Sequence, residues 1–310
     1  MPTTAAWNPP IHPFTVDDVE VTRKVLATAA RRGRVVRLAR GVYLAPEAWP
    51  DDPAAQHLLH ARAQQVRRPS LVLARESAAL AHHLPLHDQR VVANQPPQLT
   101  RAHLDDLDVV EFRTGLLAGL RLTAPARTAL DLAAAAPLPV ALVALDAVAR
   151  TALVLVDPRV EPREADEALA DQAGAPLRAA LARRGGRRLA EVVALVDPRR
   201  ESPPESYSAG IIHLSPLPEP RSQPAVVTRD GVRWPDFGWE HWRLAGEVDG
   251  AVKYRGERGD HVRIAEKLRE EALADAGWEV VRWMPTEIYR RPAAVMDRIA
   301  RALSRRGWSG

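Results

Sequence analysis

The chain has 310 residues, with 43 Lys and Arg residues against 39 Asp and Glu residues and a net charge of +4. This length predicts two or three domains, each able to bury a core. The absence of cysteine excludes disulfides and thiolate metal sites and suits a reducing cytoplasm, where we expect the protein. No apolar run approaches the ~18 residues of a membrane span, so we expect no membrane association. The motifs GxSxG, GxxxxGK[ST] and GxGxxG are absent, which argues against serine hydrolase, NTPase and dinucleotide-binding classes.

A run without acidic residues extends from Val21 to Tyr43 and carries seven basic residues. They are Arg23, Lys24, Arg31, Arg32, Arg34, Arg37 and Arg40. We expect a helix over Thr22–Arg32, followed by two strands, Arg34–Leu38 and Val42–Ala45. A helix followed by a basic two-stranded wing is the layout of a winged helix, which places the helix in the major groove and the wing on phosphate. Residues 1–50 are therefore expected to bind nucleic acid, duplex DNA in particular. The alternative is a solvated basic surface.

The stretch RGRVVRLARGVYLAP resembles the N-terminal winged helix of AbiEi-type antitoxins, the DNA-binding half of a type IV toxin–antitoxin pair. The segments LVLARESAALAHHLPL and GLRLTAPARTALDLA look like the second domain of those antitoxins. The resemblance implies a DNA-binding regulator with a toxin partner encoded nearby. The chain departs from the family at its front, where Thr15–Glu20 stands in place of a full extra helix.

The middle of the chain alternates helical and strand patterns. Pro46–Pro53 is a natural break, and an α/β middle domain is expected over residues 51–155. Its predicted elements are a helix at Ala54–Val66, strands at Ser70–Leu73 and Arg121–Thr123, and helices at Thr128–Ala136 and Pro139–Ala149. Residues 156–190 are charged and Ala-rich and are expected to form a helical linker. The histidines at 82, 83 and 87 lack acids at ligand spacing, which favours a surface or packing role.

The last part of the chain has a different order of elements. We expect a helix, three antiparallel strands, a second helix and a final strand. The corresponding ranges are Ser202–Ile212, Gln223–Arg229, Val232–Phe237, Leu244–Asp249, Asp260–Ala276 and Trp278–Met284, with a hairpin turn at Asp230-Gly231 and a helix stop at Gly277. Glu205 lies in the first turns of the leading helix.

The middle hairpin of this region carries three acidic residues. If its turn lies between His241 and Trp242, Asp236 and Glu247 face each other across the two strands. Asp249 shares the face of Glu247 because side chains alternate along a strand. Carboxylates this close repel each other, so the cluster needs a cation or a shared proton, and oxygen ligands suit Mg²⁺. The alternative is a solvated hairpin edge with these charges by chance.

This order of elements, with ESPPES, PEPRSQ, PDFGW, GEVDGAVKY, EKLREEAL and GWEVVRW, resembles the PD-(D/E)XK nucleases. Within them it looks most like the very-short-patch-repair-like endonuclease domains. The resemblance implies that Glu205, Asp236 and Glu247 bind Mg²⁺ for phosphodiester hydrolysis. The family's lysine lies two residues after the second acid, and Asp249 occupies that position here. Only three residues in the chain are lysines, and two of them, Lys253 and Lys267, are candidates to replace it, Lys253 first.

Together these patterns predict an α+β or α/β multidomain protein. Its four parts are a winged helix at 1–50, an α/β domain at 51–155, a helical linker at 156–190 and an αβββαβ restriction-endonuclease-like domain at 191–310. Two functions remain open. The protein is a DNA-directed, Mg²⁺-dependent endonuclease whose catalytic residues are Glu205, Asp236, Glu247, Asp249 and Lys253, or it is an antitoxin-type repressor whose nuclease-like domain is inactive.

Overall fold

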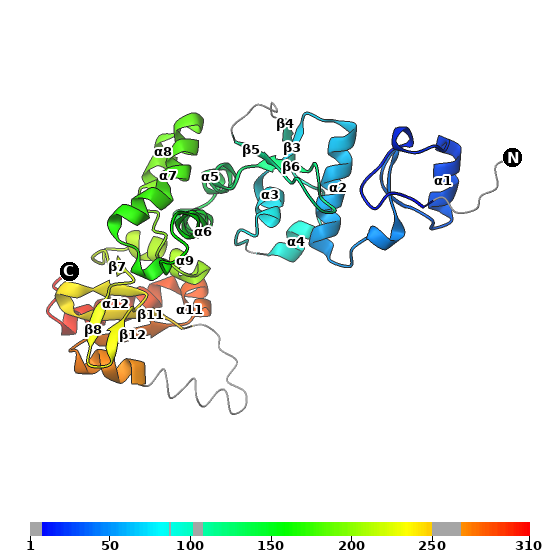
Figure 1. Cartoon of the computed structure of the whole chain (residues 1–310). Coiled ribbons are helices and arrows are strands. Elements are labelled where there is room, and N and C mark those ends of the chain that lie inside the picture. Colours follow the sequence, from blue (N-terminus) through cyan, green and yellow to red (C-terminus); the bar gives the residue numbers. More distant parts are fainter. Residues whose placement is uncertain (1–7, 87, 102–107, 250–267) are drawn as a thin grey trace. The chain divides into compact units, whose positions relative to one another are not determined.

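A computed structural model describes residues 8–86, 88–101, 108–249 and 268–310 (Figure 1). The chain forms two compact units, Met1–Leu132 and Ala133–Gly310. Each contains helices and small sheets, which confirms the expected mixed α/β, multidomain class at this coarse level. The four-part division predicted from the sequence is finer than these two units, and its boundaries stay a prediction.

The first unit begins with a short helix and a hairpin, as expected. After the 3₁₀ turn η1 (Val16–Asp18), helix α1 spans Arg23–Arg31, and the side chain of Thr22 caps it by accepting a hydrogen bond from the backbone of Val25. Strands β1 (Val36–Ala39) and β2 (Val42–Leu44) then pair antiparallel. The sequence therefore located all three elements to within one or two residues.

Two apolar clusters hold the hairpin in place. One joins α1 to the hairpin through buried Phe14, Leu26 and Tyr43. The other joins the hairpin to helix α2 (Pro53–Arg67), and its buried members are Leu38, Val42, Leu44, Leu59 and Ala63. The hairpin is thus packed between α1 and α2, so its exposed charges are carried by a fixed backbone.

The remainder of this unit surrounds a four-stranded sheet of order β4-β3-β6-β5. Strands β3 and β6 are parallel, and β4 and β5 are antiparallel edge strands. The elements are β3 (Leu71–Leu73), α3 (Arg75–Ala81), α4 (Gln89–Ala93), β4 (Leu99–Arg101), β5 (Val109–Glu111), β6 (Arg121–Thr123) and α5 (Pro125–Ala135). The Nε2–H of His82 donates to the backbone carbonyl oxygen of Thr123 at 2.7 Å, as expected for a histidine with a packing role.

The second unit opens with four helices. They are α6 (Leu138–Val156), α7 (Glu167–Arg184), α8 (Arg187–Val193) and α9 (Pro203–His213). Helix α9 packs closely against the start of α6, because a Cβ at Gly210 would lie 2.5 Å from the backbone of Pro139. Packing therefore groups α6 with the C-terminal part of the chain.

Helix α6 is longer than the sequence predicted, and the expectation that no apolar run approaches a membrane span needs correction. Its 19 residues are long and apolar enough to cross a membrane by length and composition alone. More than half of its most apolar stretch is buried inside the unit, however. It also carries Asp146, which is completely buried and paired with Arg200. These contacts are those of a helix that is part of the core of its unit.

A four-stranded sheet follows, of order β12-β11-β10-β7. Its strands are β7 (Arg221–Ser222), β10 (Phe237–Trp239), β11 (Leu244–Val248) and β12 (Glu279–Trp283). Strand β12 runs parallel to β11, and the other neighbours are antiparallel. A separate hairpin, β8 (Val226–Thr228) and β9 (Gly231–Arg233), lies between β7 and β10 in the chain.

Two strand predictions need correction here. The predicted strand Gln223–Arg229 corresponds to β8, which belongs to the separate hairpin and not to the four-stranded sheet. The predicted strand Val232–Phe237 is split between β9 and β10 by Pro235, since proline has no N–H to donate to a ladder. The turn is also one residue earlier than expected, because Thr228 pairs with Gly231.

The register of the central hairpin is as predicted. Phe237 pairs with Gly246, and Trp239 pairs with Leu244, with the 3₁₀ turn η4 (Glu240–Trp242) between the strands. Continuing this register by one step sets Asp236 opposite Glu247. The hairpin arithmetic therefore gave the correct pairing even though the outer strand was misplaced.

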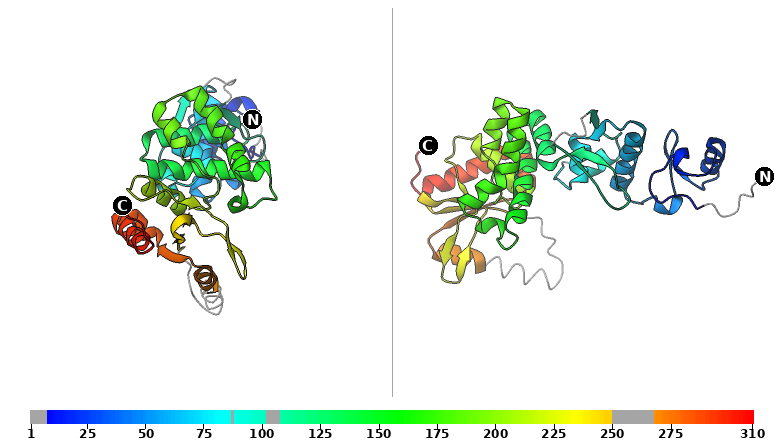
Figure 2. Two further views of the ribbon diagram at one scale, coloured as in Figure 1. Left: turned by 90° about the vertical axis from the view of Figure 1, so that its left-hand side faces the viewer. Right: turned by 45° about the horizontal axis from the view of Figure 1, so that its top comes forward.

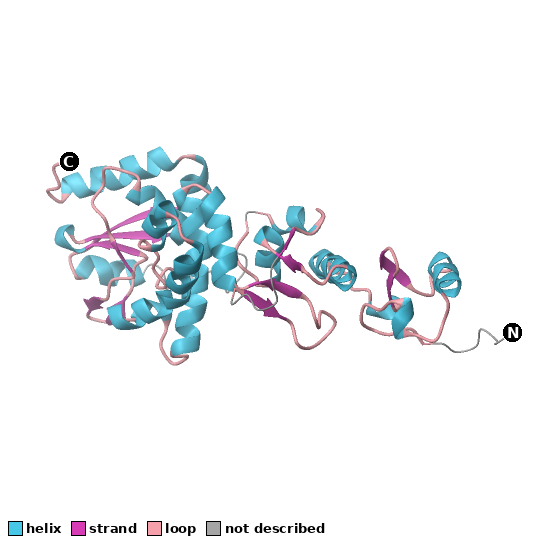
Figure 3. Ribbon diagram, turned by 90° about the horizontal axis from the view of Figure 1, so that it is seen from above, coloured by secondary structure: helices cyan, strands magenta, loops and turns pink. Residues whose placement is uncertain are grey.

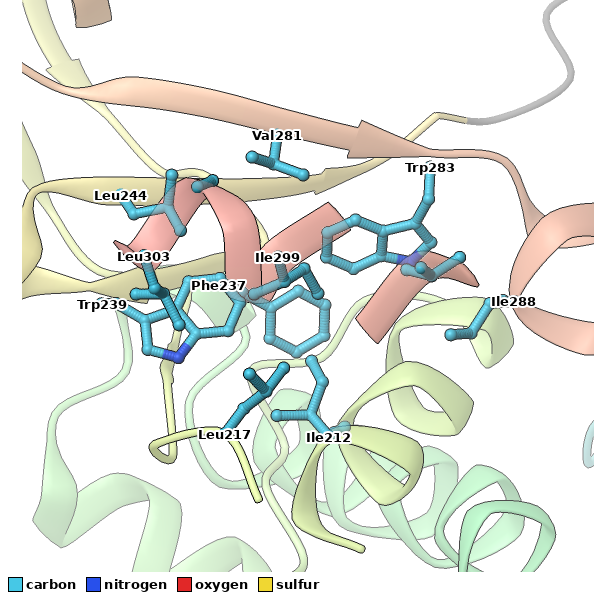
Figure 4. Packing of buried hydrophobic residues seen from close by; sticks show 13 residues of the cluster. Ile212, Leu217, Phe237, Trp239, Leu244, Val281, Trp283, Ile288, Ile299 and Leu303 are labelled. Carbon is cyan, nitrogen blue, oxygen red and sulfur yellow. The ribbon is translucent and has the colours of Figure 1, made fainter. Parts of the chain in front are cut away.

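Helices cover the sheet of this unit (Figure 3). On one face, α11 (Pro285–Arg290) and α12 (Pro292–Arg305) join α9 over a core of large apolar side chains. Phe237 and Trp283 stack at its centre with ring centroids 5.7 Å apart, and Ile299 packs beside them (Figure 4). Residues 268–275 form a helix that lies on the other side of the strands from α12 (Figure 2, right).

Candidate functional site

The acidic side chains gather on the face of the sheet opposite this core. Phe237 and Trp283 point into the core, so Asp236 and Arg282, one residue before each, point to the other face. Glu247 pairs directly with Arg282 in the parallel register of β11 and β12. The guanidinium of Arg282 contacts both Glu247, at 2.9 Å, and Asp249, at 3.8 Å. The predicted sharing of a face by the two acids is therefore confirmed.

Glu205 and Asp236 are brought together by a glutamine. The Nε2 of Gln223 lies 3.3 Å from Glu205 Oε2 and 3.3 Å from Asp236 Oδ1, and it donates to both. The two carboxyl oxygens thus converge on one nitrogen. Gln223 is buried and has φ of +47°, a left-handed conformation that side chains other than glycine rarely adopt. A strained, buried amide between two acids marks this place as specialised.

Helix α9 supplies Glu205 from its first turn. Ser202 caps the helix and donates its hydroxyl to Glu205 Oε1 at 2.6 Å, while the backbone N–H of Glu201 donates to Oε2 at 2.8 Å. The backbone of Val248 holds Asp236 in a similar way, with its N–H 2.7 Å from Oδ2. Hydrogen bonds from the backbone therefore fix the orientation of both carboxyl groups.

Glu247 is paired with arginine. Its Oε2 accepts from Nε of Arg282 at 3.0 Å, and its Oε1 lies 3.3 Å from Nε of Arg269. The second contact lacks hydrogen-bond geometry, so Glu247 Oε1 is a buried oxygen without a hydrogen-bond donor among the described residues. Arg282 also pairs with Glu270 at 2.9 Å. Two arginines thus compensate part of the negative charge that the acids bring together.

Burial controls the ionisation of the two bridged acids. It raises the pKa of Asp236 to about 8, and the nearby charges of Glu205 and Glu247 push in the same direction, while the Val248 N–H and Arg269 oppose them. Burial also raises the pKa of Glu205, against the hydrogen bonds from Ser202 and Glu201. Without a bound cation, the Asp236 carboxyl therefore holds its proton to a higher pH than an exposed aspartate does.

The donor chemistry of this cluster suits Mg²⁺, but the arrangement of side chains is not yet a metal site. Carboxylate oxygens are the ligands that this ion prefers. Glu247 Oε1 has no hydrogen-bond donor among the described residues that an ion would have to displace. Among the described residues, however, no three acidic or histidine side chains are placed to share one ion. Holding an ion would require Glu247 to exchange its arginine contacts for the metal. The three-carboxylate site therefore stays a prediction.

The positively charged side chains beside the acids in the structure are arginines, whereas lysines were predicted there. Lys253 and Lys267, the two predicted lysines, lie outside the described residues. The structure instead places Arg269 and Arg282 at Glu247, and Gln223 between the other acids. All three could have been suspected, because each lies in a stretch that carries the family resemblance: Gln223 in PEPRSQ, Arg269 in EKLREEAL and Arg282 in GWEVVRW.

The seven predicted DNA-binding residues form the second candidate site. All of them, Arg23, Lys24, Arg31, Arg32, Arg34, Arg37 and Arg40, are exposed. Within the described part of the chain, no carboxylate lies within ion-pair distance of any of them. Their charges therefore remain available to an external anion, as expected for a surface that binds phosphate.

Comparison with known proteins places the chain in a family without defining its activity. It is 31% identical over 202 residues to Uncharacterized protein Rv2248 of Mycobacterium tuberculosis strain H37Rv, covering 65% of this chain and 68% of the relative. The same values hold for Uncharacterized protein MT2308 of strain CDC 1551. The chain belongs to the family of these mycobacterial proteins. No family model matches the chain, and no solved structure matches it.

The raised pKa of Asp236 predicts how stability depends on pH when metal is removed by a chelator. The unfolded carboxyl titrates near pH 4 and the folded one near pH 8, so the folded state binds the proton more tightly. The stabilisation of the folded state by this tighter proton binding is complete below about pH 4 and is lost as the pH rises through 8. We expect the urea midpoint to fall between pH 5 and pH 9, and Asp236→Asn to flatten this fall.

Asp297→Asn is the matched control, since Asp297 is an exposed aspartate on α12, away from the acidic cluster. It should leave the pH profile unchanged. An unchanged slope in Asp236→Asn would show that this partly buried carboxyl does not titrate in this range.

The pairing of Arg282 with Glu247 predicts competition between arginine and a divalent cation. In Arg282→Gln, Glu247 loses the closer of its two arginines, and Asp249 loses its contact with the same guanidinium. We expect Mn²⁺ to bind on the order of tenfold more tightly, because a unit charge at this distance is worth at least that much at a partly buried site. Titration calorimetry measures this without reference to activity. Arg290→Gln, at an exposed arginine of α11, should bind Mn²⁺ as the unchanged protein does; equal affinities for all three proteins would rule out the competition.

Proposed function

We propose that this protein binds duplex DNA through α1 and the β1–β2 hairpin, and that its C-terminal unit carries a Mg²⁺-dependent site for phosphodiester hydrolysis. The observation that carries the proposal is the run of seven exposed cations without ion-pair partners in the described chain. Phosphate contacts by such residues release counterions and supply most of the affinity for a nucleic acid. The helix-then-hairpin order suits a winged helix, in which helix and wing have separate roles.

The rigid placement of the hairpin supports this proposal. Leu38, Val42 and Leu44 are buried against α2, while Arg37 and Arg40 on the same hairpin are exposed. Arg37 and Leu38 lie on opposite faces of β1 because side chains alternate along a strand, and Arg40 lies in the turn between the strands. Cations on a fixed backbone lose less freedom on binding than cations on a loose loop, because less ordering has to accompany the contact.

In the C-terminal unit, the three predicted ligands would have distinct roles. Glu205 and Asp236 already converge through Gln223 and would form one side of the ion site. Glu247 would complete it by turning Oε1, which has no hydrogen-bond donor, toward the ion. A bound Mg²⁺ supplies Lewis acidity at the phosphate and lowers the pKa of an attacking water. Arg269 and Arg282 are placed to balance the charge of a phosphate oxygen once Glu247 is released.

One feature favours a second candidate function, a regulator of antitoxin type whose nuclease-like domain is inactive. Arg282 neutralises Glu247 directly, and Asp249 stands where the resembled nucleases carry lysine. A site already neutralised by arginine has less need of a metal ion. This candidate expects a toxin partner, encoded next to this protein's gene, and DNA binding without cleavage.

The proposed DNA binding predicts a steep dependence of affinity on salt. Arg34→Ala combined with Arg37→Ala removes two wing cations and should reduce the slope of log affinity against log salt by about 1.8, at roughly 0.9 per phosphate contact. The loss should be equal for all duplex sequences, because phosphate carries no sequence information. Changes at Arg23 and Lys24, on the helix, should instead alter sequence preference. Fluorescence anisotropy with labelled duplexes at several salt concentrations measures both effects.

Charge substitutions test this better than removal of residues 1–50, because deletion would expose the α2 side chains Leu59 and Ala63. Arg90→Ala with Arg113→Ala is the matched control, since both arginines are exposed in the same unit outside the basic run. The proposal fails if the control pair and the wing pair weaken DNA binding equally.

A further inference from the structure

A polar groove lies beside the hairpin, and its two arginines, Arg67 and Arg68, are not among the seven basic residues of the run. It has a volume of about 340 Å³. Its lining comes from β1 on one side and the last turns of α2 on the other: Leu38, Ala39, His60, Gln64, Arg67 and Arg68. Both sides belong to the first unit, and no acidic residue is part of the lining. The groove is therefore a positively charged hollow next to the proposed wing.

Packing fixes the two sides of this groove relative to each other. The Nδ1–H of His60, on α2, donates to the backbone carbonyl of Leu38 at 3.0 Å, since only a donor can pair with that oxygen. The ring of Trp49 meets His60 edge-on, with centroids 5.6 Å apart. Leu38 itself is buried against α2. The hollow is thus formed by the fold and does not depend on flexible side chains for its shape.

Two guanidinium groups line the groove, and a third, that of Arg37, hydrogen-bonds to the backbone of a lining residue. Arg67 and Arg68 are exposed at the end of α2, and no ion pair joins either to a carboxylate in the described chain. Arg37 approaches from the wing, where its Nε lies 3.4 Å from the carbonyl oxygen of Ala39, a residue of the lining. Arginine presents a planar fork of donors that matches the oxygens of a phosphate.

Arginines at a helix C-terminus also stabilise the helix by opposing its dipole. That role needs only positive charge near the last carbonyls and has no use for a hollow or for Arg37 on a different element. The helix dipole does not explain why β1 and α2 together line a groove whose arginines have no ion pair in the described chain.

We propose that this groove binds a backbone phosphate of the same duplex that the wing contacts, so that the end of α2 extends the DNA-binding surface beyond residues 1–50. The inference rests on the proposed DNA binding. Continuity with the wing, through Arg37, favours a phosphodiester of DNA over a free anion. The surface that reads phosphate is then built from two consecutive elements of the fold, the hairpin and α2.

The test compares DNA affinity in the full-length protein across salt concentrations. Arg67→Gln with Arg68→Gln should lower the salt slope by about 1.8 and weaken binding on the order of tenfold at low salt, for all duplex sequences alike. Arg67→Lys with Arg68→Lys keeps both charges and should keep the slope. The control pair is again Arg90→Ala with Arg113→Ala. Circular dichroism establishes that each variant folds, and the lysine pair keeps the test informative if the glutamine pair does not.

The outcomes separate this inference from the function on which it rests. If the unchanged protein does not bind duplex DNA, the proposed function fails first. If it binds, and the glutamine pair binds with an unchanged slope, the groove proposal alone is wrong. A salt slope that falls equally in the lysine pair also overturns it, because charge would then not be the cause. Calorimetric binding of inorganic phosphate that is lost in the glutamine pair, with DNA affinity unchanged, would identify a free-anion site instead.

Discussion

The C-terminal unit is organised around two carboxyl groups held close together in a place with little water. Burying one ionised carboxyl is costly, and burying two side by side adds their repulsion. The protein meets this constraint with one amide shared between Glu205 and Asp236, backbone donors to each, and a raised pKa of Asp236. Gln223 accepts a left-handed backbone to take part. Such an arrangement fits the proposed cation site, since a bound cation would offset the repulsion between the two carboxyls.

The surrounding framework keeps these groups in position. Asp146 on α6 receives Arg200 at 3.0 Å and the backbone N–H of Asp197 at the same distance. This buried pair fixes the segment that leads into α9, and therefore the start of the helix that presents Glu205. Burial raises the pKa of Asp146, and Arg200 opposes that effect most strongly. Removal of one partner would leave a buried charge without compensation, which is far more destabilising than loss of an exposed pair.

The other face of the sheet is closely packed. Gly246 has room for no side chain, because a Cβ there would lie 2.8 Å from the ring of Trp283. The ring in turn donates its Nε1–H to Ser208 on α9 at 3.0 Å. Strand β11 is therefore clamped between an apolar core on one side and the acidic cluster on the other. A glycine and a tryptophan set the position of Glu247 as much as its own contacts do.

Local patterns in the sequence were enough to place α1, the β1–β2 hairpin, the central β10–β11 register and α9. The spacing of Asp236 and Glu247 gave the hairpin register, and Ser202 before Pro203 gave the start of α9. Features that depend on distant parts of the chain were missed. Gln223 was assigned to a strand, because nothing local shows that its side chain reaches two acids. Arg282 was not considered, because its pairing with Glu247 follows from a parallel crossover that no short-range pattern defines. Helix α6 was predicted too short for a similar reason, since its ends are set by packing and not by caps.

The most direct test of the account is a plasmid-cleavage assay in Mg²⁺ and Mn²⁺ with the unchanged protein and Asp236→Ala. The account predicts cleavage by the unchanged protein, and loss of cleavage in the variant with DNA affinity preserved, because the carboxylates and the basic surface lie on different units. Cleavage that is the same in both proteins would contradict the assignment of the site. DNA binding without cleavage by either would contradict the nuclease proposal and leave the antitoxin-type regulator as the better description.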